Sequence, residues 1–204
     1  MRRTVILPAL IVLLVPGLLL AEVAERDSLY HRGHDYRQWI FDQNYIGDQN
    51  SNLDPEISFV ADGRIRVHPE RVYFYNNIDL AIQIAKETGY PLSFYLSDHT
   101  CKTCLYRLPE IFENPDVVEA SRNFVNVFVD MAKEGQKVNA LGMMHTSLTV
   151  QIFLPSLRRL RVIVDAEAED VLKAFDATMA YCETLSFEER LSKELELKKS
   201  RSKY

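Results

Sequence analysis

The sequence predicts an α/β sandwich in which helices flank a mixed central β-sheet, with an extension on its N-terminal side. Between residues 78 and 182, amphipathic segments of helical length alternate with short apolar segments of strand length. The predicted order is α-β-α-α-β-α-β-β-α, and a tight turn between the last two strands makes them an antiparallel pair. Two cysteines in a CxxC arrangement, Cys101 and Cys104, lie where a strand passes into a helix.

The chain begins with MRRTVILPALIVLLVPGLLLA, residues 1–21, in which a basic start at Arg2 and Arg3 precedes an uncharged apolar segment. This pattern is typical of a secretory signal peptide. The apolar segment, 4–21, has about the length that spans a bilayer, so an uncleaved N-terminal membrane anchor is the alternative. With the two arginines held inside, either arrangement exports residues 22–204. We therefore expect a periplasmic or secreted protein, either free or anchored.

Residues 22–69 form the predicted extension, which is polar and aromatic and contains the only tryptophan, Trp39. We expect a short helix near 34–43, followed by a loop. Further along, the sequence ISFVADGRIRV places Asp62-Gly63 between two short strand-like runs, which is a strong signal for a β-hairpin. The extension should therefore carry one hairpin and either cover the main domain or serve as a spacer.

The main domain is predicted to cover residues 70–182. Asn77 is placed to cap its first helix, 78–88, and Gly89 is placed to end that helix. The later elements are predicted at 91–97 (strand), 101–113 (helix), 115–123 (helix), 124–131 (strand), 137–145 (short helix), 148–156 (strand), 157–165 (strand) and 166–185 (helix). The charged segment 183–204 is predicted to continue the last helix as a solvated tail.

The position of the CxxC suits thiol–disulfide exchange. A cysteine at a helix N-terminus meets unpaired backbone N–H groups and the positive end of the helix dipole, which favour the thiolate. Cys101 has this position, and Lys102 adds a positive charge beside it. Cys104 lies one turn further along the helix and should be more buried. An exposed thiolate that attacks a substrate disulfide and a second thiol that resolves the mixed disulfide are what exchange requires.

A proline, Pro109, follows Cys104 by five residues, and the sequence CKTCLYRLP resembles the active-site helix of the thioredoxin superfamily. The longer stretch DHTCKTCLYRLPEIFENPDVVEASRNFVNVFVDM resembles the periplasmic or secreted thioredoxin-like branch, which is related to the C-terminal domain of the transmembrane reductase DsbD. The resemblance covers about residues 70–180. It implies a thioredoxin-like three-layer sandwich and a protein-disulfide oxidoreductase of unspecified direction, with Cys101 attacking and Cys104 resolving.

The same resemblance implies that the only redox group is the Cys101–Cys104 disulfide, with no dissociable cofactor. Its partners would be substrate proteins with disulfides or thiols, together with a second dithiol protein, such as a membrane one, for electrons. The family's tryptophan before the first cysteine is replaced here by Thr100, and its buried acid by Tyr95. His99 is then the group next to the cysteines that titrates near neutral pH, and together with Lys102 it would tune the attacking sulfur.

The loop that faces the cysteines also departs from the family, which has a cis-proline there. The corresponding residue is Thr149, counted back from the aromatic residue of the following strand. A cis bond before a residue other than proline costs about 3 kcal/mol, so we expect a trans Thr149. The predicted substrate-binding residues are Thr149, which would shape the groove, and Thr100 and Thr103 beside the attacking cysteine.

Two other functions stay open. Leu105 follows the second cysteine where a c-type haem needs histidine, and no second CxxC completes a zinc site. A copper(I) chaperone could use soft thiolates, with Cys101, Cys104 and His145 as ligands. The third reading is a non-catalytic thioredoxin-like module that only docks partners. The net charge of −5 argues against nucleic-acid binding, and Cys182, inside an amphipathic helix, is predicted to be a buried apolar residue.

Overall fold

The computed structural model describes residues 11–44, 54–98, 100–144 and 146–192. Its centre is a four-stranded mixed sheet with the strand order β4-β3-β5-β6. The central strand β3 (Leu92–Ser97) pairs in parallel with β4 (Val125–Asp130) and antiparallel with β5 (Thr149–Phe153). β5 in turn pairs antiparallel with the edge strand β6 (Arg159–Val164). The mixed sheet and its final antiparallel pair are therefore confirmed.

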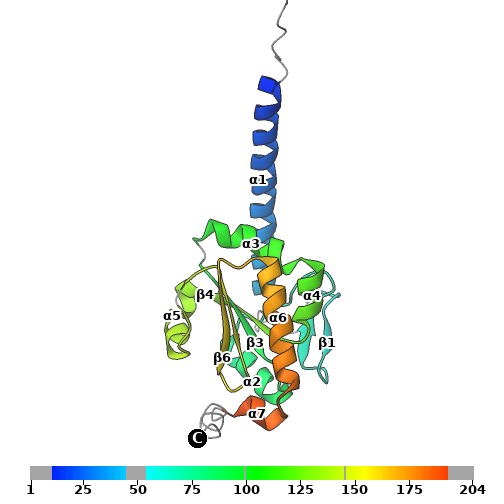
Figure 1. Cartoon of the computed structure of the whole chain (residues 1–204), viewed down its shortest axis with the longest axis vertical. Coiled ribbons are helices and arrows are strands. Elements are labelled where there is room, and N and C mark those ends of the chain that lie inside the picture. Colours follow the sequence, from blue (N-terminus) through cyan, green and yellow to red (C-terminus); the bar gives the residue numbers. More distant parts are fainter. Residues whose placement is uncertain (1–10, 45–53, 99, 145, 193–204) are drawn as a thin grey trace, which may run out of the picture.

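Helices cover both faces of this sheet, so the chain forms the three-layer sandwich that the sequence predicts (Figure 1). The helices are α1 (Ile11–Gln43), α2 (Ile78–Thr88), α3 (Lys102–Phe112), α4 (Pro115–Ser121), α5 (Met131–Ala140), α6 (Ala168–Glu183) and α7 (Phe187–Leu191). Tyr95 of β3 points to the face packed by α1, α3, α4 and α6, whereas Phe94 and Leu96 point to the face packed by α2 and α5. Successive strand residues alternate between faces, which places β3 between two apolar layers.

The first helix of the main domain has the ends that the sequence predicts. The side chain of Asn77 accepts a hydrogen bond from the Leu80 N–H at the start of α2, and Gly89 ends the helix with a φ of 74°. That left-handed conformation strains any residue that has a Cβ. Local signals therefore specify both ends of α2.

Two predicted helices have the wrong bounds. α5 begins at Met131, directly after β4, because the side chain of Asp130 accepts a hydrogen bond from the Ala132 N–H and caps the helix; it ends at Ala140 rather than running over 137–145. The C-terminal segment does not continue α6. Instead, Ser186 forms a capping box with Glu189 and is the N-cap of a separate helix, α7. The rest of the predicted tail, 193–204, lies outside the described residues.

The N-terminal extension is more regular than expected. Instead of a short helix near 34–43, a single 33-residue helix, α1, runs from Ile11 to Gln43. Tyr36 and Ile40 of α1 are completely buried in the core, so the extension is part of the domain. Of the predicted signal or anchor, residues 1–21, the first ten lie outside the described residues. In the part of the chain that the structure describes, no helix has a stretch long and apolar enough to cross a membrane.

The predicted β-hairpin is present in the extension. β1 (Ser58–Val60) pairs antiparallel with β2 (Ile65–Val67). Ala61, Asp62 and Gly63 in the turn have φ values of 51°, 57° and 78°. A short turn with positive φ matches the twist of the two strands, which is why Asp-Gly was an informative signal.

Candidate functional site

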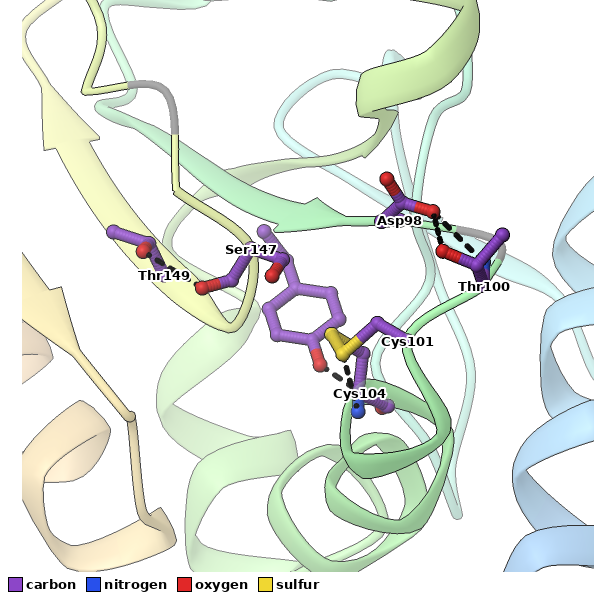
Figure 2. The surroundings of a disulfide bond; sticks show 7 residues. Asp98, Thr100, Cys101, Cys104, Ser147 and Thr149 are labelled. Carbon is purple, nitrogen blue, oxygen red and sulfur yellow. Dashed lines mark hydrogen bonds between the residues drawn. A yellow bond between two sulfur atoms is a disulfide. The ribbon is translucent and has the colours of Figure 1, made fainter.

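The two cysteines lie at the end of β3, where a tight turn leads into α3 (Figure 2). The backbone N–H of Cys101 donates to the Asp98 carbonyl at 3.0 Å. The carboxylate of Asp98 accepts from the backbone N–H and the hydroxyl of Thr100, at 2.8 and 2.7 Å. Asp98 and Thr100 therefore hold the turn that delivers Cys101 to the start of the helix.

Cys101 is the N-cap of α3 and forms a disulfide with Cys104. Its sulfur accepts a hydrogen bond from the Cys104 N–H at 3.1 Å. Cys101 is partly exposed, whereas Cys104 is only 1% exposed. In the dithiol form, the helix N-terminus and this N–H would stabilise negative charge on the accessible sulfur. The geometry thus gives the two sulfurs different surroundings.

A buried tyrosine side chain hydrogen-bonds to the backbone of Cys104. Tyr95, in the middle of β3, is completely buried, and its hydroxyl donates to the Cys104 carbonyl at 3.0 Å. Burial raises the pKa of Tyr95 well above its ordinary value. The hydroxyl therefore stays protonated at neutral pH, which makes it a donor that fixes the first turn of α3.

The loop before β5 lies on the other side of the disulfide, and Figure 2 shows Ser147 between Thr149 and the sulfurs. Thr149 is completely buried. Its hydroxyl shares a hydrogen bond with the Thr146 hydroxyl at 2.8 Å and lies within donating distance of the Ser147 carbonyl at 3.3 Å. No cis peptide bond occurs among the described residues, so Thr149 is trans as expected. Thr149 lies beneath the loop surface, whereas Thr146 is exposed and Ser147 is partly exposed. Sequence reasoning missed Ser147, whose only signal is its place just before the strand.

The exposed face of the first helical turn carries Lys102 and Thr103, both of which are exposed, as is Thr100. One turn later, the guanidinium of Arg107 bonds the carboxylates of Glu110 at 3.1 Å and Glu167 at 3.2 Å, which ties α3 to the residue before α6. The predicted substrate contacts Thr100 and Thr103 thus lie beside the partly exposed Cys101, and Thr149 does not reach the surface.

Two residues singled out from the sequence, His99 as a tuning group and His145 as a copper(I) ligand, lie outside the described residues. Cys182 is completely buried, as the sequence predicts, and burial raises the pKa of its thiol. Met143 is buried, and Met144 is 40% exposed.

A second polar cluster, which the sequence did not reveal, consists of Asp54, Glu56 and His68. The two acids lie in the loop before the hairpin, and His68 directly follows β2. The Nε2 atom of His68 lies 3.4 Å from a carboxylate oxygen of Asp54 and 3.3 Å from one of Glu56. Asp54 also accepts a hydrogen bond from the Trp39 indole at 2.9 Å. Three such side chains can hold a metal ion. However, the Nδ1 atom of His68 accepts from the Glu70 N–H at 3.1 Å, which places the proton of the neutral ring on Nε2, facing the carboxylates.

Comparisons with known proteins find only distant structural similarity. No protein-family model matches the sequence, and no curated protein matches it. Among solved structures, Trxlp from Edwardsiella tarda EIB202 is similar over 49% of this chain and 94% of its own, at 12% identity and a TM-score of 0.37. A structure described as DsbH Oxidoreductase is similar over 69% of this chain and 96% of its own, at 11% identity and a TM-score of 0.44. The thioredoxin-like fold is established by the strand order and the two covered faces of the sheet.

Proposed function

We propose that this thioredoxin-like chain is a thiol–disulfide oxidoreductase that acts on protein disulfides or dithiols outside the cytoplasm. The observation that carries the proposal is the arrangement of the Cys101–Cys104 disulfide, with Cys101 partly exposed at the N-cap of α3 and Cys104 buried. An inert structural disulfide has no need of an accessible sulfur that caps a helix, whereas exchange chemistry does. The supporting hydroxyl of Tyr95 keeps this turn in place.

In the reducing direction, the thiolate of Cys101 attacks one sulfur of a substrate disulfide. A mixed disulfide forms, and the other substrate sulfur leaves as a thiolate and takes a proton. Cys104 then loses its proton and attacks the Cys101 sulfur, which re-forms the protein disulfide and releases the second substrate thiol. Two electrons pass from the protein to the substrate, and the reverse sequence of steps oxidises a substrate dithiol.

The remaining site residues have supporting roles in this proposal. The charge of Lys102 and the ring of His99 tune the attacking sulfur, Thr100 and Thr103 contact the substrate, and Thr149 shapes the facing loop. No dissociable cofactor enters the reaction. The electrons come from, or go to, a second dithiol protein, such as a membrane protein.

Reduction of insulin disulfides tests the proposal. We expect the purified protein with a thiol reductant to accelerate insulin reduction, Cys101→Ser to abolish the acceleration, and Cys182→Ser to leave it unchanged, because Cys182 is buried on α6. Equal rates for the protein and Cys101→Ser would refute the assignment. The reduction potential of the pair then gives the direction, since a value near about −270 mV is typical of a reductant and one near about −120 mV of an oxidant.

The proposed location depends on residues 1–21, which would act as a signal peptide or, uncleaved, as an anchor. Expression of the full chain followed by N-terminal sequencing of the exported form separates the two. Retention of the chain in the cytoplasm would contradict both and would remove the oxidising compartment in which such a disulfide persists.

A further inference from the structure

The extension helix α1 crosses the redox helix α3 at very short range, close to the disulfide. A Cβ built on Gly33 would lie 1.8 Å from the carbonyl oxygen of Leu105, so only glycine allows this approach. Leu105 is the residue after Cys104. Its carbonyl has no intrahelical partner four residues on, because Pro109 has no N–H to donate. The proline thus removes the usual helical donor of the carbonyl on which α1 packs.

Further contacts fix the direction of α1 on both sides of this crossing. The rings of Tyr30 on α1 and Tyr106 on α3 meet edge to face, with centroids 5.8 Å apart. On the other side, Tyr36 is completely buried and its hydroxyl donates to the Val72 carbonyl at 2.6 Å. α1 is therefore held over more than one helical turn, and the direction in which it leaves the domain is set.

Beyond the crossing, α1 projects from the domain. Residues 24–28 are all exposed, and five consecutive residues cover more than one helical turn, so none of the described helices and strands packs along this segment. Figure 1 shows α1 continuing well past the sheet and its other helices, from the end of the domain at which α3 lies. Figure 2 shows the disulfide with α1 on one side and the loop that carries Ser147 on the other.

We infer that α1 is one wall of the substrate site and restricts Cys101 to disulfides in extended or unfolded polypeptide segments. This inference rests on the proposed function. A folded partner usually buries about 800 Å² on each side of an interface, whereas Leu105, where α1 crosses, is only four residues from Cys101, about 6 Å along the helix. A flat contact surface centred on Cys101 would therefore collide with the part of α1 that projects past this crossing (Figure 1). In this proposal an extended segment, which is much narrower than a folded surface, passes between α1 and the loop of Ser147.

The test disrupts the projecting part of α1 and leaves the disulfide unchanged. Ser28 is exposed and lies just before the part of α1 that packs on α3, so Ser28→Pro should bend α1 there and release the preceding residues, while Ser28→Ala keeps the helix. Each full-length protein is fully reduced and freed of reductant. It is then mixed with glutathione disulfide, with an unfolded polypeptide closed by one disulfide, or with a folded protein that carries the same disulfide on its surface.

We expect Ser28→Pro to raise the second-order rate constant for the folded substrate several-fold and to leave that for glutathione disulfide unchanged. Ser28→Ala should match the parent protein on all three substrates. An unchanged rate with the folded substrate, in a Ser28→Pro protein whose circular dichroism shows lost helix, overturns the inference. If the reduced parent protein reacts with none of the three disulfides, the proposed function itself fails, which is a different result.

A second measurement does not depend on bending the helix. In the Cys104→Ser background, which retains an unfolded substrate on Cys101 as a mixed disulfide, a photoreactive side chain replaces Asp27 on α1 or, as a control, Asp62 in the hairpin turn. A wall at α1 predicts crosslinks to the retained substrate from position 27 and none from position 62. Equal crosslinking from the two positions, or none from position 27, would contradict it.

Discussion

The disulfide at the start of α3 and the cluster of Asp54, Glu56 and His68 are both polar groups set against an apolar core, but they differ in access. At the disulfide, Cys101 is partly exposed and faces the loop that carries Ser147. In the cluster, the ring of His68 is only 3% exposed, and its two nitrogens face the Glu70 N–H and the two carboxylates. The histidine of the cluster is buried and both of its ring nitrogens have polar partners, whereas Cys101 of the disulfide is partly exposed to solvent.

The two regions should therefore contribute differently to stability and to activity. A buried polar group with its partners in place adds stability and specifies one packing, and a metal ion would have to displace the proton that faces the carboxylates. An accessible sulfur at a helix N-terminus can react. We therefore expect substitutions at the disulfide to change activity with little change in folding, and substitutions in the cluster to do the reverse.

The largest effects should come from the two cysteines. Cys101→Ser removes the attacking sulfur, and we expect its exchange rate to fall by at least roughly three orders of magnitude. Cys104→Ser keeps the attacking sulfur and loses the resolving one, so it should accumulate a mixed disulfide with a substrate protein. Non-reducing electrophoresis after mixing with unfolded, disulfide-containing protein distinguishes the two variants. Accumulation of the mixed disulfide in both would show that Cys104 can also attack and would undermine the contrast between exposed and buried sulfurs.

Gly33 is the point at which α1 packs on α3, so its substitution should lower stability before it changes the exchange rate. The Cβ of Gly33→Ala would meet a backbone oxygen, which cannot rotate away, and we expect a loss of about 1–3 kcal/mol in the free energy of unfolding. His34→Ala is the matched control, because His34 is the next residue and is exposed. Urea unfolding of both proteins measures the loss. Equal stability of the two variants would mean that α1 does not pack on Leu105 as described.

The sequence predicts those parts of the fold that have a local signal. The alternation of the apolar strands, the Asn77 cap and the Asp62-Gly63 turn each specify their element from a few neighbouring residues. The start of α5 was missed because only Met131 and Val138 of that helix are buried, which leaves no apolar stripe to read. The short strand-to-helix turn, in which Asp130 ends β4 and caps α5, is visible only once both elements are known.

The parts that were not predictable depend on residues far apart in the chain. From Glu25 onward α1 is mostly polar, and its place in the fold depends on the close approach of Gly33 to Leu105, for which the sequence gives no periodic pattern. His68 meets Asp54 and Glu56 only after the hairpin and the loop before it fold together. The site itself was readable at Cys101 and Cys104, because a CxxC at a strand-to-helix junction is local. The burial of Thr149 beneath its loop was not readable.

Tyr95 lies beneath the disulfide and shares features of both regions, since it is buried and partnered yet touches the reactive turn. Tyr95→Phe removes one hydrogen bond, to the Cys104 carbonyl, and should cost about 0.5–1.5 kcal/mol of stability. Because burial raises the pKa of Tyr95, the hydroxyl is no base at neutral pH, and the variant should keep the pH profile of the exchange rate. A shifted profile would show that the hydroxyl takes part in proton transfer. Thermal unfolding and stopped-flow exchange between pH 5 and 9 measure the two effects.

The smallest effect should come from His68, and its sign follows from burial. Burial lowers the pKa of His68, although the carboxylates of Asp54 and Glu56 act in the opposite direction. In the unfolded chain a histidine has a pKa of about 6.5, so as the pH falls below neutrality the unfolded state takes up the proton first. The stability that the neutral ring contributes is therefore complete above about pH 6.5 and is lost as the pH falls toward the lower pKa of the folded state.

His68→Gln keeps a donor facing the carboxylates but does not titrate, so the free energy of unfolding of this variant should vary less between pH 7 and pH 5 than that of the parent protein. His34→Gln, on the exposed surface of α1, should keep the parent's pH dependence. Chemical unfolding at several pH values measures both, and insulin reduction at pH 7 should be unaffected by either. If His68→Gln instead lowers the exchange rate and leaves the stability profile intact, the cluster acts on the reaction, and the division between the two regions is wrong.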